Sequence, residues 1–160
     1  MIQAITETSF RIFVQTEDNR INTSVASTKI RHLVKFTNDL DKSVYYAYGS
    51  SEVIKDRYTN ILIIYNANPD MYLGQTKLFP AGYWKYEIYE VSWVGTVTVS
   101  LGNAPATEDD VLTPSADTKG VVQGLVTKGK MNLSEKDGTQ QVQYLQREAE
   151  TETNYIYYGQ

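Results

Sequence analysis

Few residues of this chain have the types and spacing that enzyme chemistry requires. The 160 residues include one histidine, His32, and no cysteine. Thiolate metal sites, two-histidine metal sites within one chain and cysteine nucleophiles are therefore excluded. A Ser-His-Asp arrangement would depend on His32, which lies in an alternating, strand-like segment with no paired serine and aspartate motif nearby. A structural role for His32 is the favoured interpretation.

The glycines of GLVTKGK, residues 124–130, match the core of a phosphate-binding loop. In that motif the next residue is serine or threonine, which holds the magnesium ion, whereas this chain has Met131. The flanking residues favour strands instead of the strand, loop and helix that the motif needs. We interpret these glycines as part of a strand with a bulge or a turn.

Acidic residues gather at Glu108, Asp109 and Asp110, but the residue pattern of a calcium-binding loop is absent. The polar character of the segment predicts a solvated surface loop. No motif in the chain indicates a catalytic residue, a metal ligand or a cofactor. We therefore predict that the protein is not an enzyme and uses neither a metal nor a cofactor.

The elements that would position these residues are predicted to be strands. Apolar residues alternate along KIRHLVKFT, where His32, Val34 and Phe36 share one face, and again along SVYYAYG. The turn-forming residues Asn38–Asp41 between the two segments predict a hairpin. Further strands are predicted at residues 60–66, 74–79, 82–93, 95–102 and 121–133, and residues 51–58 come nearest to a helical turn.

The segment GYWKYEIYEVSW, residues 82–93, has the highest density of aromatic residues in the chain. Its alternation places Trp84, Tyr86 and Ile88 on one face, which we expect to be core. A glycine and an aromatic residue at these offsets are typical of the corner of an immunoglobulin-like sandwich. The polar partners, one lysine against two glutamates, offer no attraction for phosphates, which disfavours a base-stacking platform.

These patterns predict an all-β protein with the fold of an immunoglobulin-like antiparallel β-sandwich over residues 1–133. Its expected core signature is Phe36, Gly82, Trp84, Tyr86 and Ile88. Residues 103–120 contain two prolines and few apolar residues, so they are predicted to form a long loop or insertion within that domain.

Residues 134–160 are predicted to form an extended C-terminal arm. The arm is polar up to Asn154 and then ends in the strongly β-prone sequence YIYYG. An exposed β segment invites pairing with another chain, so the arm suits contact with a neighbour. The candidate partner-binding residues are Tyr45, Tyr83, Tyr89, Tyr155, Ile156, Tyr157 and Tyr158.

The overall charge and the hydropathy pattern limit the classes of partner. The formal net charge is −4, which argues against sequence-independent nucleic-acid binding because that affinity needs many lysine and arginine residues. The first twenty residues lack a basic segment followed by a continuous apolar run, and no apolar run approaches the length of a membrane span. We expect a protein that is neither exported by that route nor membrane-embedded.

Three stretches of the sequence, LVKFTNDLDKSVYYA, KDRYTNILIIYN and LFPAGYWKYEIYE, resemble a family of small virion structural proteins of tailed bacteriophages. The family is found especially in crAss-like and related phages of Bacteroidota hosts. The pieces that carry the resemblance are residues 36–39, 57–58 and 82–90, with a weaker similarity through GLVTKGK to NYIYYG. The segment 95–120 has no match in that pattern.

The resemblance implies a β-sandwich protein without enzymatic activity, present in many copies in the virion. It would act as an auxiliary, or cement, capsid protein that binds neighbouring virion subunits through its sheet edges and its C-terminal arm. A ring or adaptor protein at the head-tail junction is an alternative, and major capsid, portal or ring proteins would be the partners. A carbohydrate-binding host-adhesion module is an alternative, with Tyr45, Tyr48, Tyr83 or Tyr89 as stacking faces.

Overall fold

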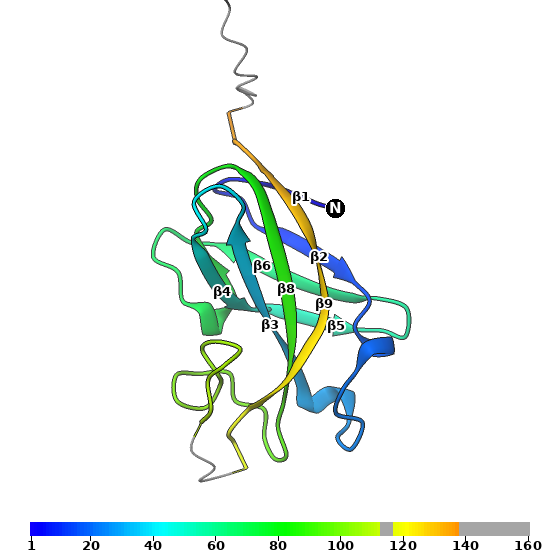
Figure 1. The fold of residues 1–160 in the computed structure, drawn as a ribbon. Helices are drawn as coiled ribbons and strands as arrows, with labels where there is room; N and C mark the ends of the chain where they lie inside the picture. The colour runs from blue at the N-terminus through cyan, green and yellow to red at the C-terminus, as the bar shows by residue number, and fades with distance from the viewer. Residues whose placement is uncertain (113–116, 138–160) are drawn as a thin grey trace, which may run out of the picture.

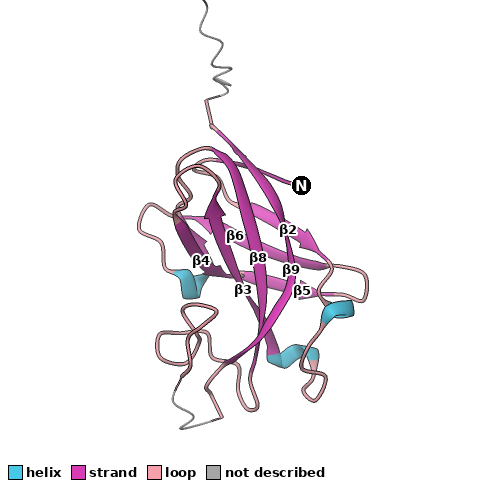
Figure 2. Ribbon diagram, viewed as in Figure 1, coloured by secondary structure: helices cyan, strands magenta, loops and turns pink. Residues whose placement is uncertain are grey.

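The computed structural model describes residues 1–112 and 117–137, which form two β-sheets packed face to face (Figure 1). Strands make up the regular structure (Figure 2). The described helices are three single turns, η1 (Glu17–Asn19), η2 (Ser27–Lys29) and η3 (Met71–Leu73). The prediction of an all-β sandwich is therefore confirmed. None of the helical turns described is long and apolar enough to cross a membrane.

The larger sheet has five strands in the order β1-β9-β8-β3-β4. Their bounds are β1 (Ile2–Ile5), β9 (Val121–Ser134), β8 (Gly82–Ser92), β3 (Ile30–Asn38) and β4 (Val44–Tyr48). All neighbours in this sheet are antiparallel except β1 and β9, which run parallel. The predicted hairpin is the connection between β3 and β4.

The smaller sheet has the order β2-β6-β5, and the short strand β7 also pairs with β6. Its strands are β2 (Phe10–Val14), β6 (Thr59–Tyr65), β5 (Ser51–Ile54) and β7 (Gln75–Thr76). The two sheet orders match those of an immunoglobulin-like sandwich, with β2, β6 and β5 as strands B, E and D and with β9, β8 and β3 as strands G, F and C.

The main core lies between the two sheets. Trp84 and Ile88 on β8 are fully buried, and Tyr86 between them is 9% exposed. The Trp84 indole N–H donates to the Pro80 carbonyl oxygen at 3.1 Å, so this ring closes the corner that precedes β8, as the sequence predicts. Gly82 begins the strand at a φ of 133°, a conformation that favours glycine. The buried members of the core are Ala4, Ile12, Val34, Phe36, Ala47, Ile61, Ile63, Leu78, Trp84, Tyr86, Ile88, Val126, Met131 and Leu133.

A second apolar cluster lies on the outer face of the five-stranded sheet. It contains Leu33, Tyr48, Val91, Trp93 and Ala104, and the connection between β8 and β9 covers it. The strand predicted at 95–102 is wrong, because no strand is present there. Val97 and Val99 alternate because they pack onto this cluster from a loop, while Leu101 is exposed.

The prediction is wrong for residues 51–58 and correct for residues 124–130. The residues 51–58 do not form a helical turn, because Ser51–Ile54 pairs with β6 as β5. The segment GLVTKGK lies within β9 and contains the bulge that its glycines predict. The register between β8 and β9 shifts there, and Gly124 has a φ of 147°.

Candidate protein-interaction surface

The predicted partner-binding tyrosines do not form one surface. Tyr45 pairs with Phe36 across β3 and β4, so it faces the core, where its ring lies 5.9 Å from the Trp84 ring. Tyr89 is partly covered and packs on the second cluster. Tyr83 is 59% exposed, which leaves it as the one exposed ring of these three. The other candidates, Tyr155, Ile156, Tyr157 and Tyr158, lie outside the described residues.

His32 is buried at the interface of the two sheets and contacts a carboxylate from the opposite sheet. Its ring Nδ1 lies 3.0 Å from Glu52 Oε2, and its backbone N–H donates to Glu52 Oε1 at 3.0 Å. Both side chains are at most 3% exposed. These contacts fit the structural role that the sequence favours. Among the described residues no group of His, Cys, Asp and Glu has the arrangement of a metal site.

Two long connections lie together at one end of the sandwich (Figure 1). Residues 15–29 join β2 to β3, and residues 93–120 join β8 to β9. In antibody variable domains the B–C and F–G connections lie at this same end and bind antigen. We call the surface that these two connections form the loop end.

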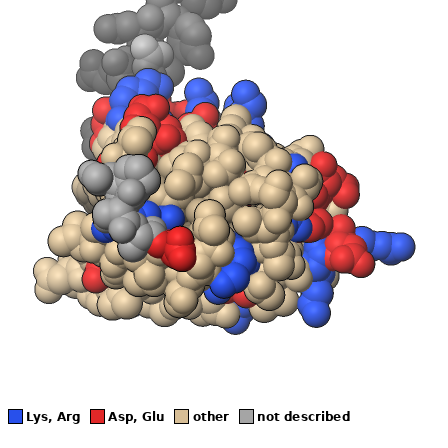
Figure 3. Space-filling model, turned by 90° about the horizontal axis from the view of Figure 1, so that it is seen from below, with Lys and Arg blue, Asp and Glu red and all other residues tan. Residues whose placement is uncertain are grey.

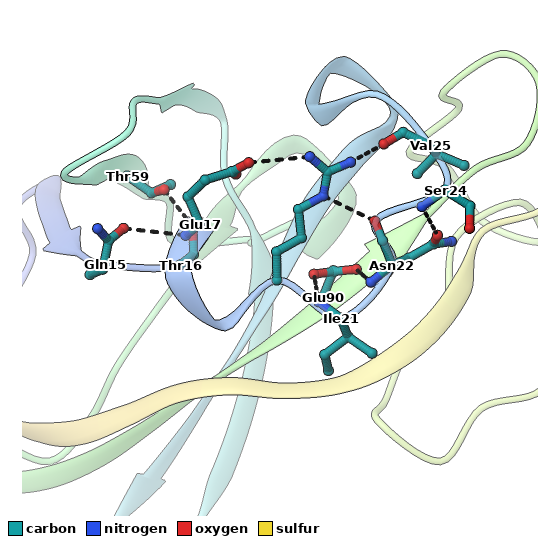
Figure 4. A network of polar contacts seen from close by, with 10 residues as sticks. Gln15, Thr16, Glu17, Ile21, Asn22, Ser24, Val25, Thr59 and Glu90 are labelled. Atoms are coloured by element: carbon teal, nitrogen blue, oxygen red, sulfur yellow. Dashed lines mark hydrogen bonds and ion pairs between the residues drawn. The ribbon is translucent and has the colours of Figure 1, made fainter.

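Glu90 on β8 fixes the first connection (Figure 4). The side chain is 1% exposed, and its two oxygens accept hydrogen bonds from the backbone N–H groups of Ile21 at 2.9 Å and Asn22 at 2.8 Å. The Asn22 amide in turn donates to Ser92 Oγ at 3.0 Å. A buried carboxylate that accepts two backbone N–H groups holds this loop in one conformation. Of the two glutamates that the sequence analysis counted among the exposed polar partners of residues 82–93, Glu90 is therefore buried, and only Glu87 is partly exposed.

Arg20 adds a second set of contacts within the same connection. Its guanidinium donates to the carbonyl oxygens of Asn22 and Val25 and to the Glu17 carboxylate. Asn19 ties the connection to the neighbouring strand, because its side-chain amide donates to the Val126 carbonyl oxygen at 3.0 Å. Hydrogen bonds thus hold this loop both internally and against the five-stranded sheet.

Glu108 docks the second connection onto the sheet. Its carboxylate accepts hydrogen bonds from Lys35 Nζ on β3 and from the Tyr46 hydroxyl on β4, the latter at 2.6 Å. Burial raises the pKa of Glu108, but the hydrogen bonds from Lys35 and Tyr46 outweigh that effect and hold it below its ordinary value. Burial and the bond to Glu108 raise the pKa of Tyr46 to about 12. Glu108 is therefore not part of a solvated acidic loop, because its side chain is only 16% exposed.

Further hydrogen bonds fix both halves of this connection. The Trp93 indole donates to the Thr118 carbonyl oxygen at 2.9 Å, and the Tyr48 hydroxyl donates to the Pro105 carbonyl oxygen at 2.7 Å. Because Tyr48 is fully buried by these contacts, it has no face available for sugar stacking. The described part of the connection is a packed layer over the sheet.

The loop end presents apolar side chains to solvent. Val94, Leu101 and Val111 are each at least 80% exposed, and Ile21 and Val121 are about half exposed. Seen from this end, most of the visible surface is uncharged, with acidic and basic residues at its margins and a few within the face (Figure 3). Exposed apolar surface on a well-fixed scaffold is typical of a site for protein contact.

The opposite end of the sandwich has one hollow of about 260 Å³, lined among others by Thr6, Tyr65, Phe79 and Lys136. Ligand sites usually enclose about 300 to 1,000 Å³, so this hollow is small for a ligand site.

No family model, no curated protein and no solved structure matches this chain.

The sequence patterns did not lead to a prediction of the charged residues that fix these connections and sheets. A signal for Glu90 was present, because the alternation that places Trp84, Tyr86 and Ile88 in the core continues to Glu90. The contacts of Glu52 and Glu108 join segments far apart in the sequence, so spacing along the chain does not indicate them.

Proposed function

We propose that this protein is a structural subunit of a tailed-bacteriophage virion, an auxiliary or cement capsid protein that binds neighbouring virion proteins. The proposal combines the sequence resemblance with one observation, the fixed and mainly uncharged loop end. That end would bind an uncharged, apolar area on a major capsid, portal or ring protein. Present in many copies, the subunit would reinforce the contacts between its neighbours.

The fixation of both connections supports this function. A surface that is already ordered before binding loses little conformational entropy when a partner docks. Glu90, Arg20 and Glu108 supply that order through contacts that lie behind the exposed apolar side chains. Enzymatic function has no comparable support, since His32 is buried against Glu52.

A ring or adaptor protein at the head-tail junction would use the same surface, and the copy number in the particle separates the two roles. The carbohydrate-binding alternative has weaker support. Of its four candidate rings, Tyr45, Tyr48 and Tyr89 are buried or packed against a core, which leaves Tyr83.

A charge placed on the loop end tests the proposal. Leu101→Asp should reduce incorporation into particles about tenfold or more in competition with the wild-type chain, because a buried unpaired carboxylate opposes docking. The matched control is Leu40→Asp at the β3–β4 hairpin, an equally exposed leucine at the other end. Incorporation is measured by mass spectrometry of purified particles. Equal incorporation of both variants would refute the docking role of this surface.

A further inference from the structure

Strand β2 has a hydrogen-bonded neighbour on one side only. An immunoglobulin-like sandwich usually has a strand A beside strand B, but here β1 pairs with β9 in the other sheet. In an antiparallel pair, alternate residues direct their N–H and C=O groups away from the partner strand. Among the described residues, the backbone of Phe10–Val14 makes no hydrogen bond outside its ladder with β6. A free edge of this kind is a template for a further strand.

The side chains of β2 are incompletely covered on both faces. Phe13 points outward and is 61% exposed, with the Tyr58 ring 6.2 Å from its own. Phe10 and Val14 point toward the core but are only partly buried. A strand with apolar residues on both faces would cover all three.

The described part of the C-terminal segment lies next to the beginning of β2. The Thr6 N–H donates to the Ser134 carbonyl oxygen at 2.8 Å, and the Lys136 N–H donates to Thr6 Oγ1 at 3.0 Å. The Lys136 ammonium also lies 3.7 Å from Glu7 Oε2. These contacts place the last described residues beside the β1–β2 turn, a few residues from Phe10.

The sequence beyond that point contains a segment of matching length and character. Residues 155–159, YIYYG, are as many as the residues of β2, and their alternation would place a tyrosine or isoleucine on each face. The intervening residues 138–154 number 17, and a chain of that length spans about 23 Å on average without regular structure. The whole of β2 is about 17 Å long.

We propose that residues 155–159 of the same chain add a strand to the free edge of β2. Main-chain hydrogen bonds to Phe10–Val14 would provide the affinity, and burial of Phe13 and Val14 would add to it. The chain's own segment is favoured over a second copy because a short tether gives an effective concentration of about 1 mM, far above micromolar protein. This docking does not depend on the proposed function.

Engineered cysteine pairs test the contact in the full chain, which has no cysteine of its own. Arg11→Cys, on the exposed face of β2, is combined in turn with cysteine at positions 155, 156, 157 and 158. Neighbouring side chains on one face of paired strands lie within disulfide range, whereas those on the other face do not. We expect a disulfide within one chain at alternate positions, seen by non-reducing electrophoresis and peptide mapping.

The matched control replaces Arg11→Cys by Leu40→Cys, which is exposed at the same end of the sandwich. Equal cross-linking at all four positions, or equal cross-linking to Leu40→Cys, would indicate that residues 155–158 reach this region without binding in one register. Either result would overturn the proposal. The proposal would also be overturned if no cross-link formed, or if the disulfides formed between two chains.

Amide hydrogen exchange gives an independent test without cysteines. Ile156→Pro removes a backbone donor, so alternate amides of Phe10–Val14 should exchange about tenfold faster than in the wild-type chain. Gln143→Pro, in the intervening residues, should leave these rates unchanged. Unchanged rates in Ile156→Pro, or equal acceleration in both variants, would contradict the added strand.

Discussion

Buried carboxylates give this sandwich contacts that its apolar core alone would not provide. Glu52, Glu90 and Glu108 lie on different elements, and each accepts hydrogen bonds from a segment remote in sequence. A buried carboxylate is costly unless it is fully paired, so each of these residues specifies one arrangement of the chain around it. At this scale the sequence indicated the apolar core but not the partners of its charges.

Glu90→Ala should destabilise the protein by about 3 kcal/mol, because two part-buried backbone N–H groups lose their charged acceptor. Urea unfolding measures this change. Glu87→Ala, on the partly exposed face of the same strand, is the control and should cost less than about 1 kcal/mol. Similar losses in the two variants would show that Glu90 does not organise the β2–β3 connection.

Docking of the β8–β9 connection should depend on pH through Glu108. Its pKa in the folded protein is lowered from 4.5, so its stabilising contribution is present above that value and is lost as the pH falls through the lower folded value. The indole N–H of Trp93, which bonds to Thr118 within this connection, reports the docking by NMR. As the pH falls below 4.5, exchange of this indole N–H should accelerate progressively in the wild-type chain. Glu108→Gln should lack this pH-dependent change, and the same acidic change in both proteins would exclude Glu108 as its cause.

The strands show how far alternation can be used to predict elements. It indicated β3, β4 and β8 correctly, since these strands have one face on an apolar cluster. The bulge in β9 was indicated by the glycines of GLVTKGK instead. Alternation failed at 95–102 because a loop packed on a sheet also directs alternate residues inward. It missed β5 because Glu52, a charged residue, occupies one of its inward positions. The residue that Glu52 contacts, His32, lies in the other sheet, so the pattern within residues 51–54 does not reveal this contact.

The packing of the β8–β9 connection can be tested with two valines of that connection. Val97 packs on the second cluster, whereas Val94 is 80% exposed. Val97→Asp should release the connection, because a carboxylate would have to be buried against the second apolar cluster. Trypsin cleavage after Lys119 should then become about tenfold faster or more, since cleavage follows the population of the open form. Equal cleavage rates in Val97→Asp and Val94→Asp would contradict this packing.

The whole molecule is a sandwich whose two ends differ. One end is the mainly uncharged loop end, and the other has the β1–β2 turn beside the last described residues of the chain (Figure 1). Such an arrangement suits a repeated subunit that binds a partner through one end.

The most direct test of the virion proposal is a cryo-electron microscopy map of a tailed-phage particle produced with this chain. We predict many copies of the sandwich per particle, each with Val94, Leu101 and Val111 against a neighbouring virion protein. Absence of the chain from purified particles, or a loop end that faces solvent in every copy, would contradict the proposal.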